Sequence, residues 1–506
     1  MARERISDQQ PRMDGGLNDV SDEGSLQPNQ LRQAMNARLT EYGAVTKRGG
    51  TQRTNSTALA ASVTNGFSWR KDSTGAQELM AVSNGTLYTA AYGSFPITWT
   101  AQSGALSSSV APTFAQFRDG ANDVVYIGDG GLLNKWDGTT LTTDIAGTIG
   151  ATMIVVHNER LWSCGCSVNP DSIFYSALND GDTLGNAGAN GGEIIVRTFG
   201  DENVVSLASV NTSLLIFHRR GISRLTGYGQ DDITVAPAGV TADVGMIAAK
   251  SVVPVGNVAF FVSERGLYRV NESDVAPVGT VEKPDPILAP LRTLSAAEFD
   301  NIRAVFNRAT RELWISMPSY GVYVYNTILL SWSGPWDNGY LTPATTALFG
   351  ALNSNGLPIV LRGDASGYVS LCDAPGVGLD NLAADGSGGT RYTMAAQMHR
   401  MYAGDDALAK ALRWGYVTAN LKGSDQCEVR WNTDTDSGAY TLPPTTLQLW
   451  GVGTWGTGSW ASGSVQSYRV PMGGTGYYTD VTVVDSGAAL PVISRVQLEQ
   501  FALGRR

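Results

Sequence analysis

The chain has 506 residues, which is enough for two or three domains around a substantial core. It holds 59 glycines and only 16% charged residues, and with its many Thr, Ser, Val and Trp residues it favours strands and tight turns over helices. No apolar run reaches about 18 residues, and the charged N-terminus has no apolar stretch, so we expect neither a membrane span nor a secretory signal.

The net charge of −10 is unevenly distributed along the chain. Residues 56–390 hold 18 Lys and Arg residues against 30 Asp and Glu residues, a balance of −12, and each flanking segment is near +1. An acidic domain is a poor tight binder of nucleic acid, because that affinity comes mainly from neutralising phosphates. The same charge suits a wall past which DNA slides.

Residues 1–55 form the first predicted unit, a mostly irregular N-terminal docking segment. It begins like a loop, and Pro28 then opens a short predicted helix. Leu31, Met35 and Leu39 lie on one face of this helix at i, i+4 and i+8, and we take them as candidate docking residues. The basic turn KRGG at 47–50 follows a short strand. It lacks Walker spacing and a following helix, so we do not assign nucleotide binding to it.

Residues 56–385 carry a repeat of about 45 residues, in which a short apolar run, a polar turn, a glycine and a second apolar run recur. Each unit predicts a β-hairpin, and hairpins repeated at this period indicate a β-propeller of six to eight blades. A seventh unit, near residue 175, turns at Asn-Pro-Asp instead of glycine. An irregular β-sandwich is the alternative. The pivot glycines are Gly85, Gly131, Gly221, Gly266, Gly321 and Gly367.

Residues 386–506 form the last predicted unit, an antiparallel β-sandwich reached through a linker at 386–398. The segments QCEVRW, YYTDVTVV and ISRVQLEQF alternate apolar and polar residues, as half-buried strands do.

Trp450, Trp455 and Trp460 lie five residues apart among glycines within this last unit. A period of five places them on one face of neither a strand nor a helix, so we interpret them as structural anchors. A stacking platform for sugars is the alternative.

The sequence offers little for catalysis, metals or cofactors. Four scattered cysteines, Cys164, Cys166, Cys372 and Cys427, lack the spacing of a zinc site and indicate buried thiols in a reduced compartment. Adjacent carboxylates such as those at 180–182 and 231–232 are typical of turns on a glycine-rich chain. We therefore predict no catalytic residue, no metal ligand and no cofactor, and the protein is not expected to be an enzyme. A propeller glycosidase is the weakest of the alternatives.

Three stretches near the N-terminus, GGLN at 15–18, LQPNQLRQAMNARL at 26–39 and KRGGTQR at 47–53, resemble the opening of tail nozzle proteins of short-tailed bacteriophages. The C-terminal stretch GGTGYYTDVTVVDSG and the final GRR are also similar to that family. At both ends of the chain the resemblance rests on sequence motifs, and in the middle it rests on the predicted propeller architecture.

The resemblance implies a structural, non-catalytic protein of the virion tail, made in the cytoplasm of the bacterial host. It implies a homohexameric ring that docks to the adaptor and other tail proteins and forms the distal DNA channel for genome ejection. Two further alternatives stay open, a glycan-binding adhesin and a tail-tip protein of a long-tailed phage.

Overall fold

The computed structural model describes residues 5–505, except residues 11, 198, 200–201, 228–232, 242, 403, 405, 425 and 444–464. The described chain is all-β, with two one-turn helices, α1 (Leu288–Leu291) and α2 (Ala296–Phe299). Five short 3-10 helices accompany them: η1 (Glu23–Ser25), η2 (Gly181–Thr183), η3 (Ala187–Ala189), η4 (Ala249–Ser251) and η5 (Asn338–Tyr340). No helix in these described ranges has the length and apolar character needed to cross a membrane.

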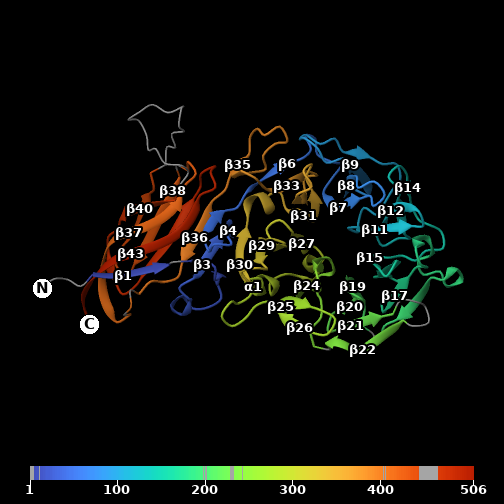
Figure 1. Cartoon of the computed structure of the whole chain (residues 1–506), viewed down its shortest axis with the longest axis horizontal. Helices are drawn as coiled ribbons and strands as arrows, with labels where there is room; N and C mark the ends of the chain where they lie inside the picture. Colours follow the sequence, from blue (N-terminus) through green and yellow to red (C-terminus); the bar gives the residue numbers. More distant parts are fainter. Residues whose placement is uncertain are drawn as a thin grey trace.

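Successive antiparallel sheets form a β-propeller, seen on the right of Figure 1, so the predicted fold is confirmed. Each blade takes four strands, which run outward from the centre in chain order, except that the outermost strand of the last blade comes from the N-terminal segment. The sheets, which we number as blades 1 to 7, are β7 (Val63–Arg70), β8 (Gln77–Ser83), β9 (Thr86–Ala90) and β10 (Thr100–Ala101); β11 (Thr113–Asp119), β12 (Asn122–Gly128), β13 (Asn134–Trp136) and β14 (Leu141–Thr142); β15 (Met153–His157), β16 (Arg160–Cys164), β17 (Ser172–Tyr175) and β18 (Gly192–Ile195); β19 (Val204–Val210), β20 (Ser213–His218), β21 (Ile222–Thr226) and β22 (Thr234–Thr241); β23 (Val253–Val255), β24 (Val258–Ser263), β25 (Gly266–Val270) and β26 (Val275–Pro277); β27 (Arg303–Asn307), β28 (Glu312–Met317), β29 (Gly321–Asn326) and β30 (Ser331–Trp336); and β31 (Thr345–Leu352), β32 (Pro358–Asp364), β33 (Val369–Ala374) and β6 (Gly50–Arg53).

Blades 1–5 and 7 are separate four-stranded sheets, and blade 6 belongs to a larger sheet. The ring closes because β31 of blade 7 lies against β7 of blade 1. Separate clusters of buried apolar side chains fill the spaces between neighbouring blades, since a single blade cannot bury both of its faces alone.

The predicted hairpins are the second and third strands of the blades. Asn84 and Gly85, with φ of 50° and 71°, join β8 to β9 in the left-handed conformation that tight hairpin turns require. The unit near residue 175 is the pair β16 and β17, whose connection contains Asn169-Pro170-Asp171.

The N-terminal segment is not irregular, and the predicted helix is wrong. Residues 30–39 form two strands, β3 (Gln30–Met35) and β4 (Ala37–Leu39). Residues four apart lie on one face of a strand, whose period is two, and also on one face of a helix, whose period is about 3.6. The spacing of Leu31, Met35 and Leu39 therefore does not distinguish a strand from a helix. Hydrogen bonds to distant strands decide the outcome: β3 pairs with β30 on one side and with β36 (Met394–Met398) on the other.

The predicted linker at 386–398 is also wrong in its second half, because β36 is a buried strand. The sheet continues from blade 6 through β3 and β36, so propeller and sandwich share one sheet. It ends in β42 (Thr479–Asp485), β38 (Cys427–Thr433) and β39 (Ser437–Thr441), with β2 (Gly16–Leu17) beside β3.

A second sheet packs on this one and completes the sandwich on the left of Figure 1. Its strands are β4, β5 (Val45–Lys47), β43 (Val492–Arg505), β37 (Leu408–Asn420) and β40 (Gln466–Pro471), with β1 (Arg5–Gln10) and β41 (Thr475–Gly476) at its margins. The three segments predicted to alternate are β38, β42 and β43, and they bury their apolar residues as expected. A two-stranded sheet, β34 (Leu379–Asp380) and β35 (Thr390–Arg391), precedes β36.

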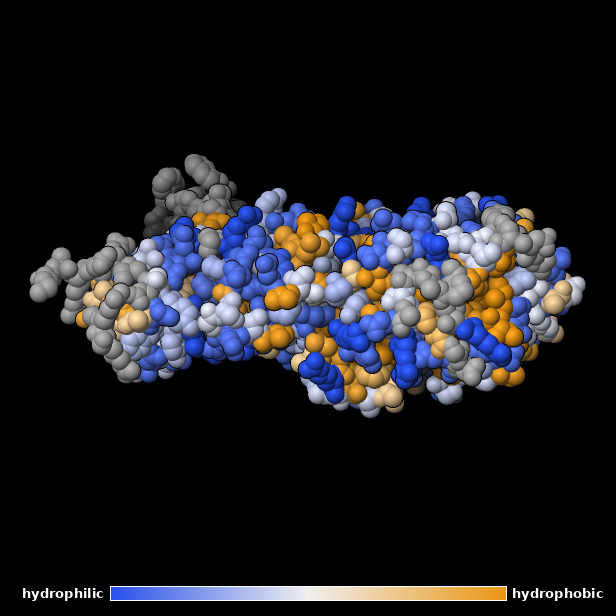
Figure 2. Space-filling view, turned by 90° about the horizontal axis from the view of Figure 1, so that it is seen from below, coloured by the Kyte–Doolittle hydropathy of each residue, from blue (hydrophilic) through white to orange (hydrophobic). Residues whose placement is uncertain are grey.

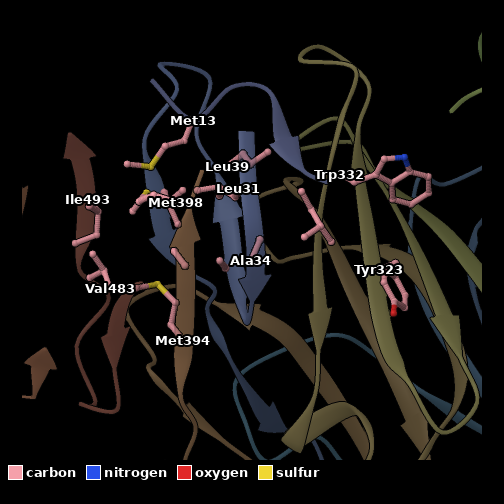
Figure 3. Packing of buried hydrophobic residues seen from close by; sticks show 14 of the residues in the cluster. Met13, Leu31, Ala34, Leu39, Tyr323, Trp332, Met394, Met398, Val483 and Ile493 are labelled. Carbon is pink, nitrogen blue, oxygen red and sulfur yellow. The ribbon is translucent and has the colours of Figure 1, made fainter. Parts of the chain in front are cut away.

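One continuous core joins the two halves. Figure 3 shows Leu31, Ala34 and Leu39 of the N-terminal strands between Trp332 of blade 6 and Met398 of the sandwich sheet. All five side chains are at most 4% exposed. The N-terminal strands therefore act as the packing layer between propeller and sandwich.

Candidate functional site

The basic turn at 47–50 lies at the junction of propeller and sandwich, where Arg48 is fully buried. Its guanidinium donates to both carboxylate oxygens of Asp380, from Nη1 at 2.8 Å and from Nη2 at 2.6 Å. Its Nε donates to Asn36 Oδ1, and its two remaining N–H groups donate to the carbonyls of Gly49 and Asp337. Arg48 thus satisfies all of its five donors.

Two aromatic rings lie close to the same guanidinium. Its carbon lies 3.9 Å from the ring centre of Tyr392 and 4.9 Å from that of Tyr340. Burial alone would lower the pKa of Arg48, but the Asp380 carboxylate outweighs it and holds the pKa above its usual value. Asp380 also accepts a hydrogen bond from the backbone N–H of Gly339 at 3.0 Å.

Lys47 points to the sandwich side and is equally buried. Its ammonium lies 3.2 Å from Asp485 Oδ2, donates to the carbonyl of Gly487 at 2.5 Å and lies 4.4 Å from the ring centre of Tyr392. Burial lowers the pKa of Lys47, and Asp485 opposes that shift. Lys47 and Arg48 therefore bind opposite halves of the molecule from adjacent positions.

A third cation, Arg38 of β4, reaches into two blades. It donates to Glu312 of β28 from Nε at 3.0 Å and from Nη2 at 2.7 Å, and from Nη1 to Asp373 of β33. Glu312 in turn accepts a hydrogen bond from the indole N–H of Trp314 at 3.1 Å. We call Arg38, Lys47 and Arg48 with their carboxylate partners the seam.

The two glycines of the basic turn are required by close backbone approach. A Cβ on Gly50 would lie 1.8 Å from the carbonyl oxygen of Leu379, and one on Gly49 would lie 2.6 Å from Asp373 Oδ1. Only glycine fits where the backbone of a neighbouring strand comes this near. The turn is therefore a structural joint, and the backbone N–H groups of Gly49 and Gly50 already donate to Asp373 Oδ1 and to the carbonyl of Val377.

The candidate docking residues have different positions. Leu31 and Leu39 are 0% and 4% exposed within the chain's own core, and Met35 is half-buried at the end of β3. The two leucines are therefore not available as surface anchors for a partner. Trp450, Trp455 and Trp460 lie outside the described residues, and their anchoring role stays a prediction.

A cavity of about 440 Å³ opens at one mouth of the propeller's central channel. Six of the seven blades contribute to its lining, each at or just before the start of its innermost strand. Five of the thirteen lining residues carry small hydroxylated side chains: Ser62, Thr64, Ser109, Thr152 and Thr346. The charged side chains of the lining are Lys250, Asp300 and Arg303.

Lys250 lies across this mouth. It belongs to η4, which leads into blade 5, yet its Nζ donates to the carbonyl of Ala111, which leads into blade 2, at 2.6 Å. Burial lowers the pKa of Lys250 to about 7, and the charge of nearby Arg303 acts in the same direction. Burial likewise lowers the pKa of Arg303 to about 10, against the opposing effect of Asp300.

A second cavity, of about 460 Å³, lies at the opposite mouth, where the innermost strands end. Its cations, Arg70 and Arg308, are exposed to solvent. The two mouths thus differ, because Arg303 is buried and Lys250 half-buried at the first, whereas both cations of the second are exposed.

Sequence reasoning missed the two cations of the first mouth. Lys250 precedes a short strand and Arg303 begins one, and neither stands in a motif. The prediction of buried thiols is confirmed, since all four cysteines are buried and free of disulfides. Within the described ranges, no group of three His, Cys, Asp or Glu side chains is arranged to hold a metal ion.

No protein-family model and no curated protein matches the sequence. Among solved structures, the chain is similar to the extracellular domain of a hybrid two-component system from B. thetaiotaomicron, with 14% identity and a TM-score of 0.39 over 64% of this chain and 41% of that one. It is also similar to the N-terminal domain of Nup159, with 11% identity and a TM-score of 0.39 over 68% of this chain and 98% of that one.

Proposed function

We propose that the protein is a structural component of a bacteriophage tail, one subunit of a homohexameric nozzle ring that conducts and retains genomic DNA. The observation that carries the proposal is the place of the N-terminal stretches that resemble the nozzle family. They supply β3, β4, β6 and the basic turn, which bind blades 6 and 7 to the sandwich.

A joint of this kind suits a part that bears load. Arg48 and Lys47 hold Asp380 and Asp485 from adjacent positions, and β3 makes one sheet of blade 6 and the sandwich. Because the two halves share a sheet and a core, we expect them to move as one body. A ring that contains DNA under pressure needs rigid subunits of this type.

The surface offers candidate contacts for neighbouring subunits. Figure 2 shows hydrophobic patches among hydrophilic residues over the propeller half of one face. Val281, Ile328 and Leu330 are exposed apolar residues, and their loops are joined where Lys283 Nζ donates to the carbonyl of Leu329 at 3.0 Å. Apolar side chains gathered in this way are typical of interaction surfaces.

The acidic propeller fits a DNA conduit on separate grounds. Part of the −12 balance of residues 56–390 would face the lumen of the ring, where like charge keeps phosphates from adhering. Screening limits this repulsion to about 8–10 Å at physiological salt. Reversing the charge of lumen carboxylates would then slow DNA ejection and leave assembly intact.

Electron microscopy of the purified chain, alone and mixed with the portal and adaptor complex of its phage, tests the proposal. We expect a six-fold ring with a central channel on the distal end of the adaptor. A monomer in isolation is compatible with assembly on a template. An antibody against the propeller, applied to virions, gives a second measurement. The assignment is refuted if the chain does not bind the adaptor complex and the antibody does not label the virion tails.

A further inference from the structure

The mouth of the propeller channel that contains Lys250 has the features of a ligand site. It is a cavity of about 440 Å³ closed on its sides by the innermost strands, and this volume lies within the range of small-molecule sites. Its five Ser and Thr hydroxyl groups come from blades 1, 2, 3 and 7, which are neighbours in the ring, so they line one side of the cavity. Lys250 and Arg303 come from blades 5 and 6 on the other side.

Arg303 is buried in the wall of this cavity and incompletely paired. It is 6% exposed, its Nη1 donates to the carbonyls of Asp300 and Ile302, and its Nε, which solvent does not reach, finds no acceptor among the described residues. No hydrogen bond from its Nη2 group is recorded in that part of the chain either. A buried charged donor without a partner is costly, so it indicates a missing acceptor.

Lys250 brings a second basic group to the same cavity, and it is charged below its pKa of about 7. Its ammonium has three protons, and a single hydrogen bond, to the carbonyl of Ala111, is recorded for it in the described structure. Asp300 is the one carboxylate of the lining, and it lies exposed at the rim. The lining therefore holds two basic groups against one carboxylate, inside a chain whose net charge is −10.

We propose that this channel mouth binds an oxyanion, the carboxylate or phosphate group of a hydroxylated ligand of about monosaccharide size. Lys250 and Arg303 hold the charged group, because charge-assisted hydrogen bonds to an oxyanion use the donors that the protein leaves open. The Ser and Thr hydroxyls on the other side of the cavity accept hydrogen bonds from the hydroxyl groups of the ligand, because those of Thr64, Thr152 and Thr346 already donate to backbone carbonyls. This site does not depend on the tail proposal, since it lies within one subunit.

Isothermal titration of the full chain with three probes, D-glucuronate, inorganic phosphate and D-glucose, tests the proposal. We expect binding of glucuronate, phosphate or both, with a dissociation constant of about 1 mM or tighter, and at least tenfold weaker binding of glucose. Glucuronate alone identifies an acidic sugar as the ligand class, and phosphate alone identifies a phosphorylated one. Absence of binding by both anions at about ten times that concentration overturns the proposal.

Two variants and a control test whether the anion binds in this cavity. Lys250→Met should weaken anion binding about tenfold or more, and Lys250→Arg should restore most of it because the charge is kept. Arg308→Met at the opposite mouth is the matched control and should change affinity less than about twofold. Anion binding that Lys250→Met leaves unchanged, or that Arg308→Met reduces equally, also overturns the proposal.

Discussion

Arg48 and Asp380, 332 positions apart in the chain, form a fully buried two-pronged ion pair at the junction of propeller and sandwich. Removing one partner of such a pair leaves an unpaired buried charge and costs about 3–5 kcal/mol. We therefore expect Arg48→Met to lower the free energy of unfolding by about that amount, measured by denaturant titration.

The exposed pair of Arg430 and Glu428, with a distance of 3.2 Å between its charged atoms, supplies the control. Arg430→Met should change the free energy of unfolding by less than about 1 kcal/mol, because solvent screens exposed ion pairs. Equal effects of the two variants would show that the seam is not a stabilising joint.

Gly50 gives a steric test of the same joint. A methyl group there would meet the carbonyl of Leu379 at 1.8 Å, so Gly50→Ala should displace β34 from β6. We expect a loss of about 1–3 kcal/mol in the free energy of unfolding. Gly350→Ala is the control, because a Cβ at Gly350 of β31 has no neighbour within 4 Å. A stability of Gly50→Ala like that of Gly350→Ala would contradict the close approach.

The N-terminal segment should not be removable. Its strand β6 supplies the outermost strand of blade 7, and β3 joins blade 6 to the sandwich. Deleting residues 2–55 should therefore abolish cooperative thermal unfolding and lead to aggregation, as followed by circular dichroism and gel filtration. If the shortened chain is soluble and melts like the full chain, the segment is a detachable arm instead.

Sequence patterns predicted the hairpins of the blades correctly, but they did not predict the N-terminal strands. Each hairpin has its signal within about 15 residues, as at Asn84-Gly85, so local pattern was sufficient. Ala34, in contrast, pairs with Gly334 and Ala396, about 300 residues away or more, and no local pattern carries that information.

The candidate site escaped prediction for a related reason. Lys250 and Arg303 are 53 positions apart, and the packing of blade 5 against blade 6 brings them to one cavity. The basic turn at 47–50 was visible as a motif, but its role in the seam depends on carboxylates at 380 and 485. The tryptophan triplet lies outside the described residues and stays a prediction.

The lowered pKa of Lys250 predicts that the stability of the chain depends on pH. Its pKa is about 7 in the folded chain and near 10.5 when unfolded, so between these values the unfolded state binds one proton more. Stability linked to this group therefore rises with pH from about 7 to 10.5, by at most about 1.4 kcal/mol per pH unit. Lys250→Met removes the titrating group, so the free energy of unfolding of the variant should lack this rise. Plotted against pH, the free energies of unfolding of wild type and variant should therefore diverge over this range. Parallel curves for wild type and variant over this range would mean that Lys250 keeps its proton in the folded chain, held by the carbonyl of Ala111 and by Asp300 against the charge of Arg303.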